Sequence, residues 1–192
     1  MFSVSNFEDV QQGIGLVLAG LGLSVEEEGL ADTPSRVAKF YQEYLQGVNL
    51  IDVLGTSFER PEGEPRTMVC QDRIPFRALC EHHLLPFFGE AAVGYIPNDR
   101  VVGLSKLSRL VDAAGTRRPS IQERISEEIV DALMNGLDAS GAIVVIKAEH
   151  MCMAVRGVNK PGVVTTTSAI RGVFVEDAVA RQEFLTLVRW SK

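Results

Sequence analysis

The sequence predicts an α+β fold, with an N-terminal helical segment at residues 1–62 followed by a larger domain at residues 63–192. Three observations support this. Apolar residues recur at helical spacing in the first part of the chain, short strand-like runs begin near residue 67, and helical spacing returns between those runs. A chain of 192 residues, 46% of them hydrophobic, suits one soluble domain with a helical addition.

The N-terminal segment is predicted to hold two helices. The first covers residues 6–23, where apolar side chains recur at the spacing of an amphipathic helix. The second begins at Asp32-Thr33-Pro34, a capping residue followed by a proline suited to the first helical turn, and it stops near Gly47. Residues 48–66 are predicted to form a loop because Pro61, Gly63 and Pro65 break regular structure.

The remaining residues alternate between strand and helix patterns. Pro97-Asn98-Asp99 is predicted to turn into a short extended run at 101–103. The chain is expected to close with an amphipathic helix at 177–190. The predicted strands are 67–78, 90–96, 141–156 and 163–174, and the predicted central helices are 105–114 and 120–137.

Charge and composition narrow the class of protein. The net charge of −6 argues against a general nucleic-acid or membrane-surface binder, although a local basic pocket for a small anion remains compatible with it. The first residues lack the pattern of an export signal, and no run of about 18 apolar residues is present. Three cysteines, an odd number, suggest a reducing compartment. We therefore expect a cytoplasmic protein that binds neither nucleic acid nor membrane.

Two short clusters hold all three histidines and two of the three cysteines. They are Cys80-Glu81-His82-His83 and His150-Met151-Cys152. Thiolate and imidazole are the ligands that zinc prefers, and a catalytic zinc site uses three of them and keeps one position open. Five candidate groups can supply that set and leave imidazoles for proton transfer. The clusters therefore indicate a zinc enzyme.

The spacing within each cluster gives a first geometry. Side chains alternate faces along a strand, so on the predicted strand 141–156 His150, Cys152 and Arg156 share one face, while Met151, Met153 and Val155 face the core. The C-x-x-H spacing of Cys80 and His83 suits a turn that converges on one ion. Cys70 has no histidine near it in the sequence and is assigned to strand packing.

These residue types also have ordinary structural uses. A lone cysteine is usually a small buried hydrophobe, and a lone histidine is usually a hydrogen-bonded structural residue. Spacing alone leaves open which three of the five groups bind the metal. It also leaves open a closed four-ligand structural site.

Several motifs resemble the GTP cyclohydrolase I family, in the right order and at about the right spacing. The run C-E-H-H-L-L-P-F-F-G at 80–89 is the most distinctive. The others are D-T-P-S-R-V-A-K at 32–39, G-L-S-K-L-S-R at 103–109, Q-E-R at 122–124, H-M-C-M-A-V-R-G at 150–157 and T-T-T-S at 165–168. The resemblance covers about residues 7–190. The T-T-T-S run is part of the family pattern, but no role is assigned to it.

The resemblance implies a ligand set and a reaction. Cys80, His83 and Cys152 would bind Zn²⁺, leaving one position for a water whose pKa zinc lowers to about 7. His82 and His150 would be the catalytic imidazoles. The family opens the guanine imidazole ring of GTP, releases C8 as formate and forms 7,8-dihydroneopterin triphosphate. His150 suits protonation of N7, while His82 and Ser105 suit the later proton transfers.

The resemblance also implies a set of substrate contacts. Ser105, Lys106 and Arg109 would bind the triphosphate, together with Lys39 and Arg156. On local pattern alone Ser105 is an N-cap, and Lys106 and Arg109 lie on a solvated helix face. A helix N-terminus with adjacent cations is nevertheless also a suitable anion site.

Glu123 and its neighbour Gln122 belong to the Q-E-R motif. Ser120-Ile121-Gln122-Glu123 fits a capping box, in which Glu123 would only cap its own helix. The family resemblance instead makes Glu123 the acceptor for the guanine N1 and 2-amino groups, and it places Gln122 among the substrate-binding residues. A carboxylate suits those donors and rejects adenine, which lacks them.

The family fold is the tunnelling fold, an antiparallel sheet with helices on one face, here with an N-terminal helical hairpin. Its subunits form a homodecamer with active sites at subunit interfaces, which would also cover exposed strand edges. Three alternatives remain open on the residues. They are a zinc hydrolase acting on another purine or pterin, a structural-zinc interaction module, and a regulatory paralogue without GTP turnover.

Overall fold

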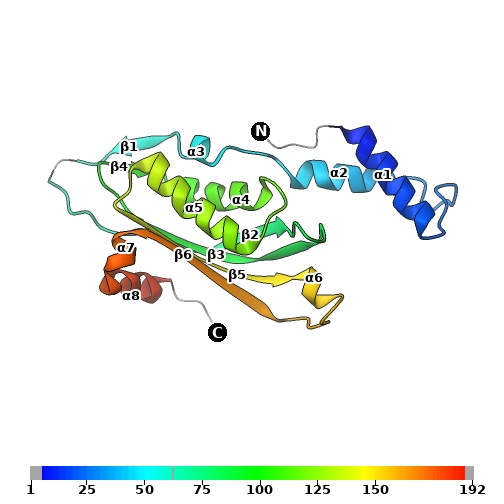
Figure 1. Ribbon diagram of the computed structural model, residues 1–192. Helices are drawn as coiled ribbons and strands as arrows, with labels where there is room; N and C mark the ends of the chain where they lie inside the picture. Colours follow the sequence, from blue (N-terminus) through cyan, green and yellow to red (C-terminus); the bar gives the residue numbers. More distant parts are fainter. Residues whose placement is uncertain (1–5, 62, 189–192) are drawn as a thin grey trace. The chain divides into compact units, whose positions relative to one another are not determined.

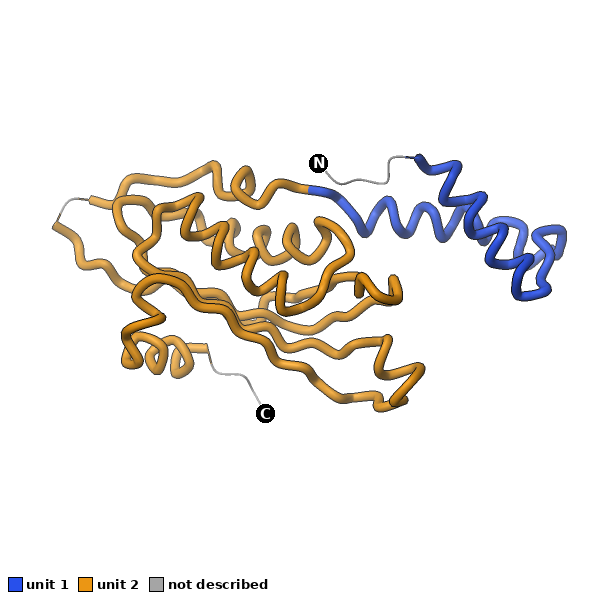
Figure 2. The backbone as a smooth tube through the Cα atoms, in the orientation of Figure 1, with its two compact units in different colours: residues 1–47 blue, residues 48–192 orange. Residues whose placement is uncertain are grey.

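The computed structural model describes residues 6–61 and 63–188 and divides into two compact units, residues 1–47 and 48–192 (Figure 2). The first unit is a pair of packed helices, α1 (Phe7–Gly20) and α2 (Thr33–Tyr44), as the sequence predicted. The Asn6 side chain caps α1 by accepting hydrogen bonds from the backbone of Glu8 (3.0 Å) and Asp9 (3.3 Å). Pro34 occupies the first turn of α2.

The second unit begins with short elements where the sequence predicted only a loop. They are α3 (Leu50–Val53) and β1 (Ser57–Glu59), which pairs in antiparallel fashion with β4 (Arg100–Val102). The Asn49 side chain caps α3 by accepting a hydrogen bond from the Ile51 amide at 3.0 Å. Leu50 and Leu54 are buried in the main core, so tertiary burial stabilises elements too short to show a periodicity.

The centre of the second unit is a four-stranded antiparallel sheet in the order β2-β3-β5-β6 (Figure 1). Its strands are β2 (Val69–Leu79), β3 (Pro86–Ile96), β5 (Gly141–His150) and β6 (Val164–Gly172). The predicted strand at 90–96 is longer than expected because residues 86–89 continue the pairing with the end of β2. The predicted α+β fold with an antiparallel sheet is confirmed.

Helices α4 (Ser105–Thr116) and α5 (Gln122–Leu137) cover one face of this sheet (Figure 1). Their apolar residues recur every three or four positions and are fully buried, as Leu107, Leu110, Ile125, Ile129 and Leu133 illustrate. They form the main core with the inward-facing residues of the strands. This is the larger hydrophobic core of the chain.

The opposite face of the sheet is covered only near one end, by α7 (Val173–Glu176) and α8 (Ala178–Leu187) (Figure 1). Phe174 and Phe184 are fully buried there, in a second apolar cluster with Ile143. The predicted C-terminal helix begins as expected, with the Asp177 carboxylate accepting from the Val179 amide at 2.7 Å. The residues of that prediction beyond 188 lie outside the described part of the chain.

The predicted strand 141–156 is wrong at its C-terminal end. β5 stops at His150, and Met151–Ala154 form a single helical turn, α6. Val155, expected in the core, is 65% exposed. A run of apolar residues does not distinguish a strand from a helical turn, so the sequence pattern extended β5 too far.

Within residues 6–61 and 63–188, none of the helices combines the length and apolar character needed to traverse a bilayer.

Candidate metal centre and active site

The first cluster forms the turn between β2 and β3. The Leu84 amide donates to the Cys80 carbonyl at 2.8 Å, and the Cys80 amide donates to the Leu85 carbonyl at 2.9 Å. Leu84 has φ +54°, a left-handed conformation unusual for a leucine, which closes the turn. This tight turn brings the side chains of Cys80 and His83 together, with the Cys80 Sγ 3.7 Å from the His83 Nδ1.

The same turn is fastened to the start of α5. The Ser120 amide donates to the Leu79 carbonyl at 2.9 Å, and the Glu81 amide donates to the Ser120 carbonyl at 3.1 Å. The Arg124 guanidinium forms an ion pair with the Glu81 carboxylate. The hydrogen bond from Arg124 lowers the pKa of Glu81, so this carboxylate stays ionised and keeps its partner. The cluster is therefore held by two elements distant in sequence.

Three donors from the two clusters lie close enough to share one metal ion. The ligand atoms of Cys80, His83 and Cys152 are all within 4.8 Å of one another. Cys152 reaches the group from α6, and not from a strand as predicted. Two thiols and an imidazole match the preferences of zinc and leave a fourth position open. The residues present therefore fit the predicted Zn²⁺.

The environment of the two thiols also suits a bound cation. Burial raises the pKa of Cys152, and the neighbouring Cys80 raises it further because two thiolates repel each other. A divalent cation between the two sulfurs would offset this repulsion and favour both thiolates.

His82 lies beside the three donors but outside the group that they form. Its Nδ1 is 3.8 Å from the Cys80 Sγ, and its Nε2 is 3.9 Å from the Glu81 Oε1. Its side chain is 65% exposed. It is therefore accessible to a substrate.

His150 is half-buried and tightly held at the end of β5. It is the cross-strand partner of Phe87, and the two rings stack with centroids 4.3 Å apart and planes 7° apart. Its Nε2 is 2.8 Å from the Gln122 Oε1. Burial lowers the pKa of His150, with a smaller opposite effect from the Glu123 carboxylate. The imidazolium form of His150 is therefore a stronger acid than the imidazolium form of an exposed histidine.

Gln122 is buried and has a different environment from the one expected of a substrate contact. Its Nε2 lies 3.0 Å from the Ile146 carbonyl and 3.1 Å from the Thr165 carbonyl and the Thr167 hydroxyl. With its Oε1 on His150, the amide is fully engaged within the chain. The sequence pattern does not predict these contacts. Two of them come from the T-T-T-S run at 165–168, through the Thr165 carbonyl and the Thr167 hydroxyl.

The capping-box interpretation of Glu123 is wrong. α5 begins at Gln122, its N-cap is Ile121, and no side chain caps it. Ser120 instead lies in the β-bridge with Cys80. Glu123 is exposed in the first turn of α5, close enough to His150 to affect its pKa. Its carboxylate is thus not needed by its own helix.

The predicted phosphate-binding residues are divided between separate places. Arg156 follows α6, and its guanidinium contacts the His83 Nε2, so it belongs to the metal centre. Ser105, Lys106 and Arg109 lie in the first turns of α4. Ser105 is the first helical residue, and its expected N-cap position is taken by Leu104. Lys39 lies on α2 in the first unit, 3.9 Å from the Glu43 carboxylate.

Within one chain, the first turn of α4 is far from the metal centre. Ser108 Oγ donates to the Gln71 Oε1 at 3.0 Å, whereas Gly115, near the other end of α4, packs against the Arg77 carbonyl. Gln71 lies near the start of β2, and Arg77 lies near its end, just before Cys80. The helix therefore runs toward the cluster, with Ser105 and Lys106 at its distant end.

Cys70 packs in the sheet as predicted. It is half-buried on β2 and lies against the second apolar cluster. Burial raises the pKa of its thiol, and Asp72 and Glu183 add to the effect. Cys70 does not belong to the group of ligand atoms formed by Cys80, His83 and Cys152.

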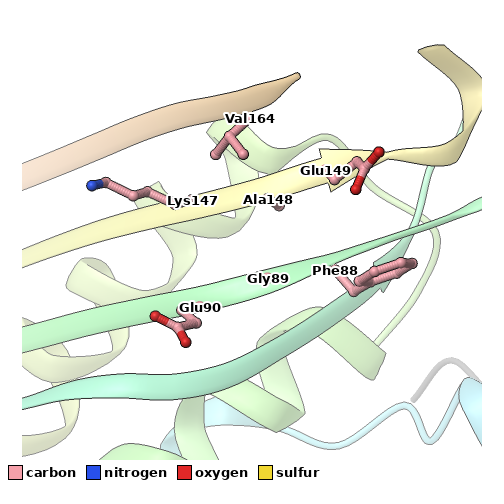
Figure 3. Close-up of a pocket in the computed structure, with 7 residues that line it drawn as sticks. All are labelled: Phe88, Gly89, Glu90, Lys147, Ala148, Glu149 and Val164. Atoms are coloured by element: carbon pink, nitrogen blue, oxygen red, sulfur yellow. The ribbon is translucent and has the colours of Figure 1, made fainter. Parts of the chain in front are cut away.

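A shallow hollow of about 350 Å³ lies on the open face of the sheet near the metal centre (Figure 3). Phe88, Glu90, Lys147 and Glu149 point into it. Because side chains alternate along strands, Phe88 and Glu149 face away from their neighbours Phe87 and His150. The hollow and the histidine site therefore lie on opposite faces.

Comparison with known proteins gives one family over nearly the whole chain. A family model described as GTP cyclohydrolase I matches residues 10–189. A relative from Halalkalibacterium halodurans called GTP cyclohydrolase 1 is 49% identical over 95% of this chain and 96% of its own length. A relative of the same name from Brevibacillus brevis is 46% identical over 96% of this chain and 98% of its own length. A solved archaeosine synthase QueF-Like, in the apo form, is 18% identical, with a TM-score of 0.44 over 57% of this chain and 96% of that one.

Proposed function

Since this chain belongs to the GTP cyclohydrolase I family, we propose which of its residues carry out that family's reaction. Its activity is the zinc-dependent hydrolytic opening of the guanine imidazole ring of GTP, with release of formate and rearrangement to 7,8-dihydroneopterin triphosphate. One observation supports the assignment most strongly. Two thiols and an imidazole lie within 4.8 Å of one another, beside a second histidine that is held for proton transfer.

Cys80, His83 and Cys152 are the proposed zinc ligands. When bound, zinc supplies a Lewis acid that lowers the pKa of a water to about 7. The ligands come from the β2–β3 turn and from α6, and the ion pair of Glu81 with Arg124 supports the turn. Such supporting contacts orient ligands in metal sites.

His150 is the proposed acid that protonates N7 of guanine. C8 is a poor electrophile until N7 carries a proton, and the lowered pKa of His150 makes its imidazolium a readier donor. His82, exposed beside Cys80, is proposed to move protons during ring opening and rearrangement. Phe87 keeps the His150 ring plane fixed while this occurs.

Glu123 and Arg156 are the proposed substrate contacts near this centre. The Glu123 carboxylate is exposed beside His150 and is suited to accept hydrogen bonds from the guanine N1 and 2-amino groups. Arg156 brings a fixed positive charge to the metal centre, where it suits a phosphate oxygen. Gln122, predicted as a further substrate contact, is buried, and its amide contacts His150 and the carbonyls of Ile146 and Thr165.

A second copy of the chain is proposed to supply Ser105, Lys106 and Arg109. These residues lie in the first turns of α4, which pack beside Gln71 near the start of β2, whereas Cys80 and the metal cluster follow the other end of that strand. Assembly would also cover the outer edges of β2 and β6 and the exposed apolar residues Leu16 on α1 and Leu21 at its C-cap. We propose a homodecamer with interfacial sites, to which Lys39 also contributes, and a cytoplasmic location.

The direct test is mass spectrometry of GTP incubated with the zinc-loaded protein, beside a chelator-treated control. We expect formate and dihydroneopterin triphosphate only with zinc. His150→Ala should abolish turnover while zinc stays bound, whereas Cys152→Ala should lose both zinc and turnover. Unchanged GTP would favour a structural-zinc module or a regulatory paralogue, and loss of zinc in His150→Ala would overturn the ligand assignment.

A further inference from the structure

We infer that Gln122 is a positioning residue that holds His150 in the tautomer protonated on Nε2, and that the Thr165–Ser168 run fixes Gln122 in turn. This inference rests on the proposed role of His150 in proton transfer. It gives a function to a polar run that otherwise has none, and to a glutamine that is only 1% exposed.

The orientation of the Gln122 amide follows from its neighbours. Two of them, the Ile146 carbonyl at 3.0 Å and the Thr165 carbonyl at 3.1 Å, can only accept hydrogen bonds. The amide nitrogen must therefore face these two strands, which directs the Oε1 to His150. An amide oxygen can only accept, so the His150 Nε2 at 2.8 Å must carry the proton that it donates.

Hydroxyl groups on α5 and β6 fix the polarity of the network further. Ser126 Oγ donates its single proton to the backbone carbonyl of Gln122 at 3.1 Å. Thr167 Oγ1, 2.9 Å from Ser126 Oγ, must then be the donor in that pair, and its lone pairs remain to accept from the Gln122 amide at 3.1 Å. Each hydrogen bond in the network thus has a defined donor and acceptor. If the amide were reversed, the Gln122 Oε1 would face the Ile146 and Thr165 carbonyls, and none of these three oxygens could donate.

The consequence for His150 is that only Nδ1 is left for the reaction. Nε2 is bound to a buried group, and the stack on Phe87 prevents the ring from turning over. Nδ1 is therefore the ring nitrogen that remains for contact with the substrate. A hydrogen bond to one ring nitrogen commonly fixes which nitrogen is active.

Two nearly isosteric substitutions separate this role from simple structural support. Gln122→Met removes the acceptor for Nε2–H, whereas Gln122→Glu keeps an oxygen there but loses the amide donors to the two carbonyls. Burying a carboxyl against those carbonyls should make Gln122→Glu the less stable variant. We expect Gln122→Met to lower kcat by about 10- to 100-fold with zinc content and KM for GTP almost unchanged, and Gln122→Glu to retain more activity despite its lower stability. If activity simply followed stability, the positioning role would be refuted.

The tautomer itself can be measured without any activity assay. Solid-state NMR of the full-length zinc-loaded protein, labelled with ¹⁵N-histidine, reports which ring nitrogen is protonated in an assembly of any size. The chain has only three histidines, and the His150 signal is identified by its loss in His150→Gln. We expect Nε2–H at pH 8 in the wild type and a shift to Nδ1–H in Gln122→Met. An Nδ1–H wild-type signal would overturn the inference even if the Gln122 variants do not fold.

These measurements also separate failure of the inference from failure of the proposed function. If the Nε2–H signal is present but GTP is unchanged, the positioning contact is supported and the proposed role of His150 is refuted. If GTP is turned over and the signal is Nδ1–H, the proposed function is supported and the inference about Gln122 is refuted. Thr166→Val is a matched control, because Thr166 belongs to the same run but is exposed and lines the hollow beside α8, on the other face of β6 from Thr167. It should keep the Nε2–H signal and change kcat by less than about threefold.

Discussion

The two ends of the central sheet differ in what covers the face opposite α4 and α5. At one end, Ile143 and Val145 of β5 pack beneath Phe184 of α8 in the second apolar cluster. At the other end, the next two positions on the same face are Lys147 and Glu149, which line the open hollow (Figure 3). The metal centre and His150 lie at this second end.

The difference teaches that stability and chemistry are concentrated at different ends of the same strands. Where both faces are covered, every residue from Gly141 to Ile146 is buried. Toward His150 the burial falls, and the side chains on the open face become charged. His150 lies on the other face of the same strands, and its ring is held by a hydrogen bond from its Nε2 to Gln122 and by stacking on Phe87.

The largest expected effect comes from breaking the covered end. Phe184→Ala should lower the free energy of unfolding by about 3–5 kcal/mol, because it empties a fully buried site beneath the sheet. Phe88→Ala at the open end, where the side chain is 47% exposed, is the control and should cost under about 1 kcal/mol. Denaturant unfolding of both variants measures this. Equal losses would mean that the two ends do not differ as described.

A smaller loss is expected from crowding the strands beside the metal centre. In Gly89→Ala the new Cβ would lie 1.9 Å from the Lys147 carbonyl oxygen, so β3 and β5 must separate. We expect a cost of about 1–3 kcal/mol together with reduced turnover, since the pairing of Phe87 with His150 depends on that register. Thermal unfolding and a GTP assay test this. Gly15→Ala on α1, which meets no atom within 4 Å, should not destabilise the protein.

The stacking on His150 can be separated from ordinary packing by a pair of substitutions. Phe87→Leu should cost about 1 kcal/mol and lower kcat several-fold, because His150 loses the ring that fixes its plane. Phe76→Leu removes the neighbouring ring, 5.7 Å from Phe87, without touching His150. It should cost similar stability while kcat stays the same. If the two variants have the same kcat, Phe87 only fills space.

The smallest effect concerns the reactivity of the three thiols at pH 8. The raised pKa of Cys70 leaves less thiolate at this pH than an ordinary cysteine has, so alkylation there should be slow. In the zinc-loaded protein Cys80 and Cys152 should be protected, and a chelator should expose them. Peptide mass spectrometry after iodoacetamide treatment would locate the label. Fast labelling of Cys70, or labelling of Cys80 and Cys152 that does not increase with the chelator, would contradict this account.

The elements that the sequence predicted well are those with a strong repeating pattern. The helices at α1, α2, α4 and α5 follow from apolar periodicity, which is clearest in α4 and α5 because each of these two buries one continuous face. The pattern failed where an element is too short to repeat. α3, β1 and α6 have three or four residues each and are held by capping, pairing and burial.

The site shows the same division between local and tertiary information. The sequence alone determined the kinds of groups available, because thiols and imidazoles in two short clusters have few other uses together. Tertiary structure decided their partners. The capping box at Ser120 was not formed because Ser120 pairs with Cys80, and Gln122 became a support for His150 because β5 and β6 bring carbonyls to it. Hydrogen bonds between residues more than 20 positions apart leave no local periodicity, so only the folded chain reveals them.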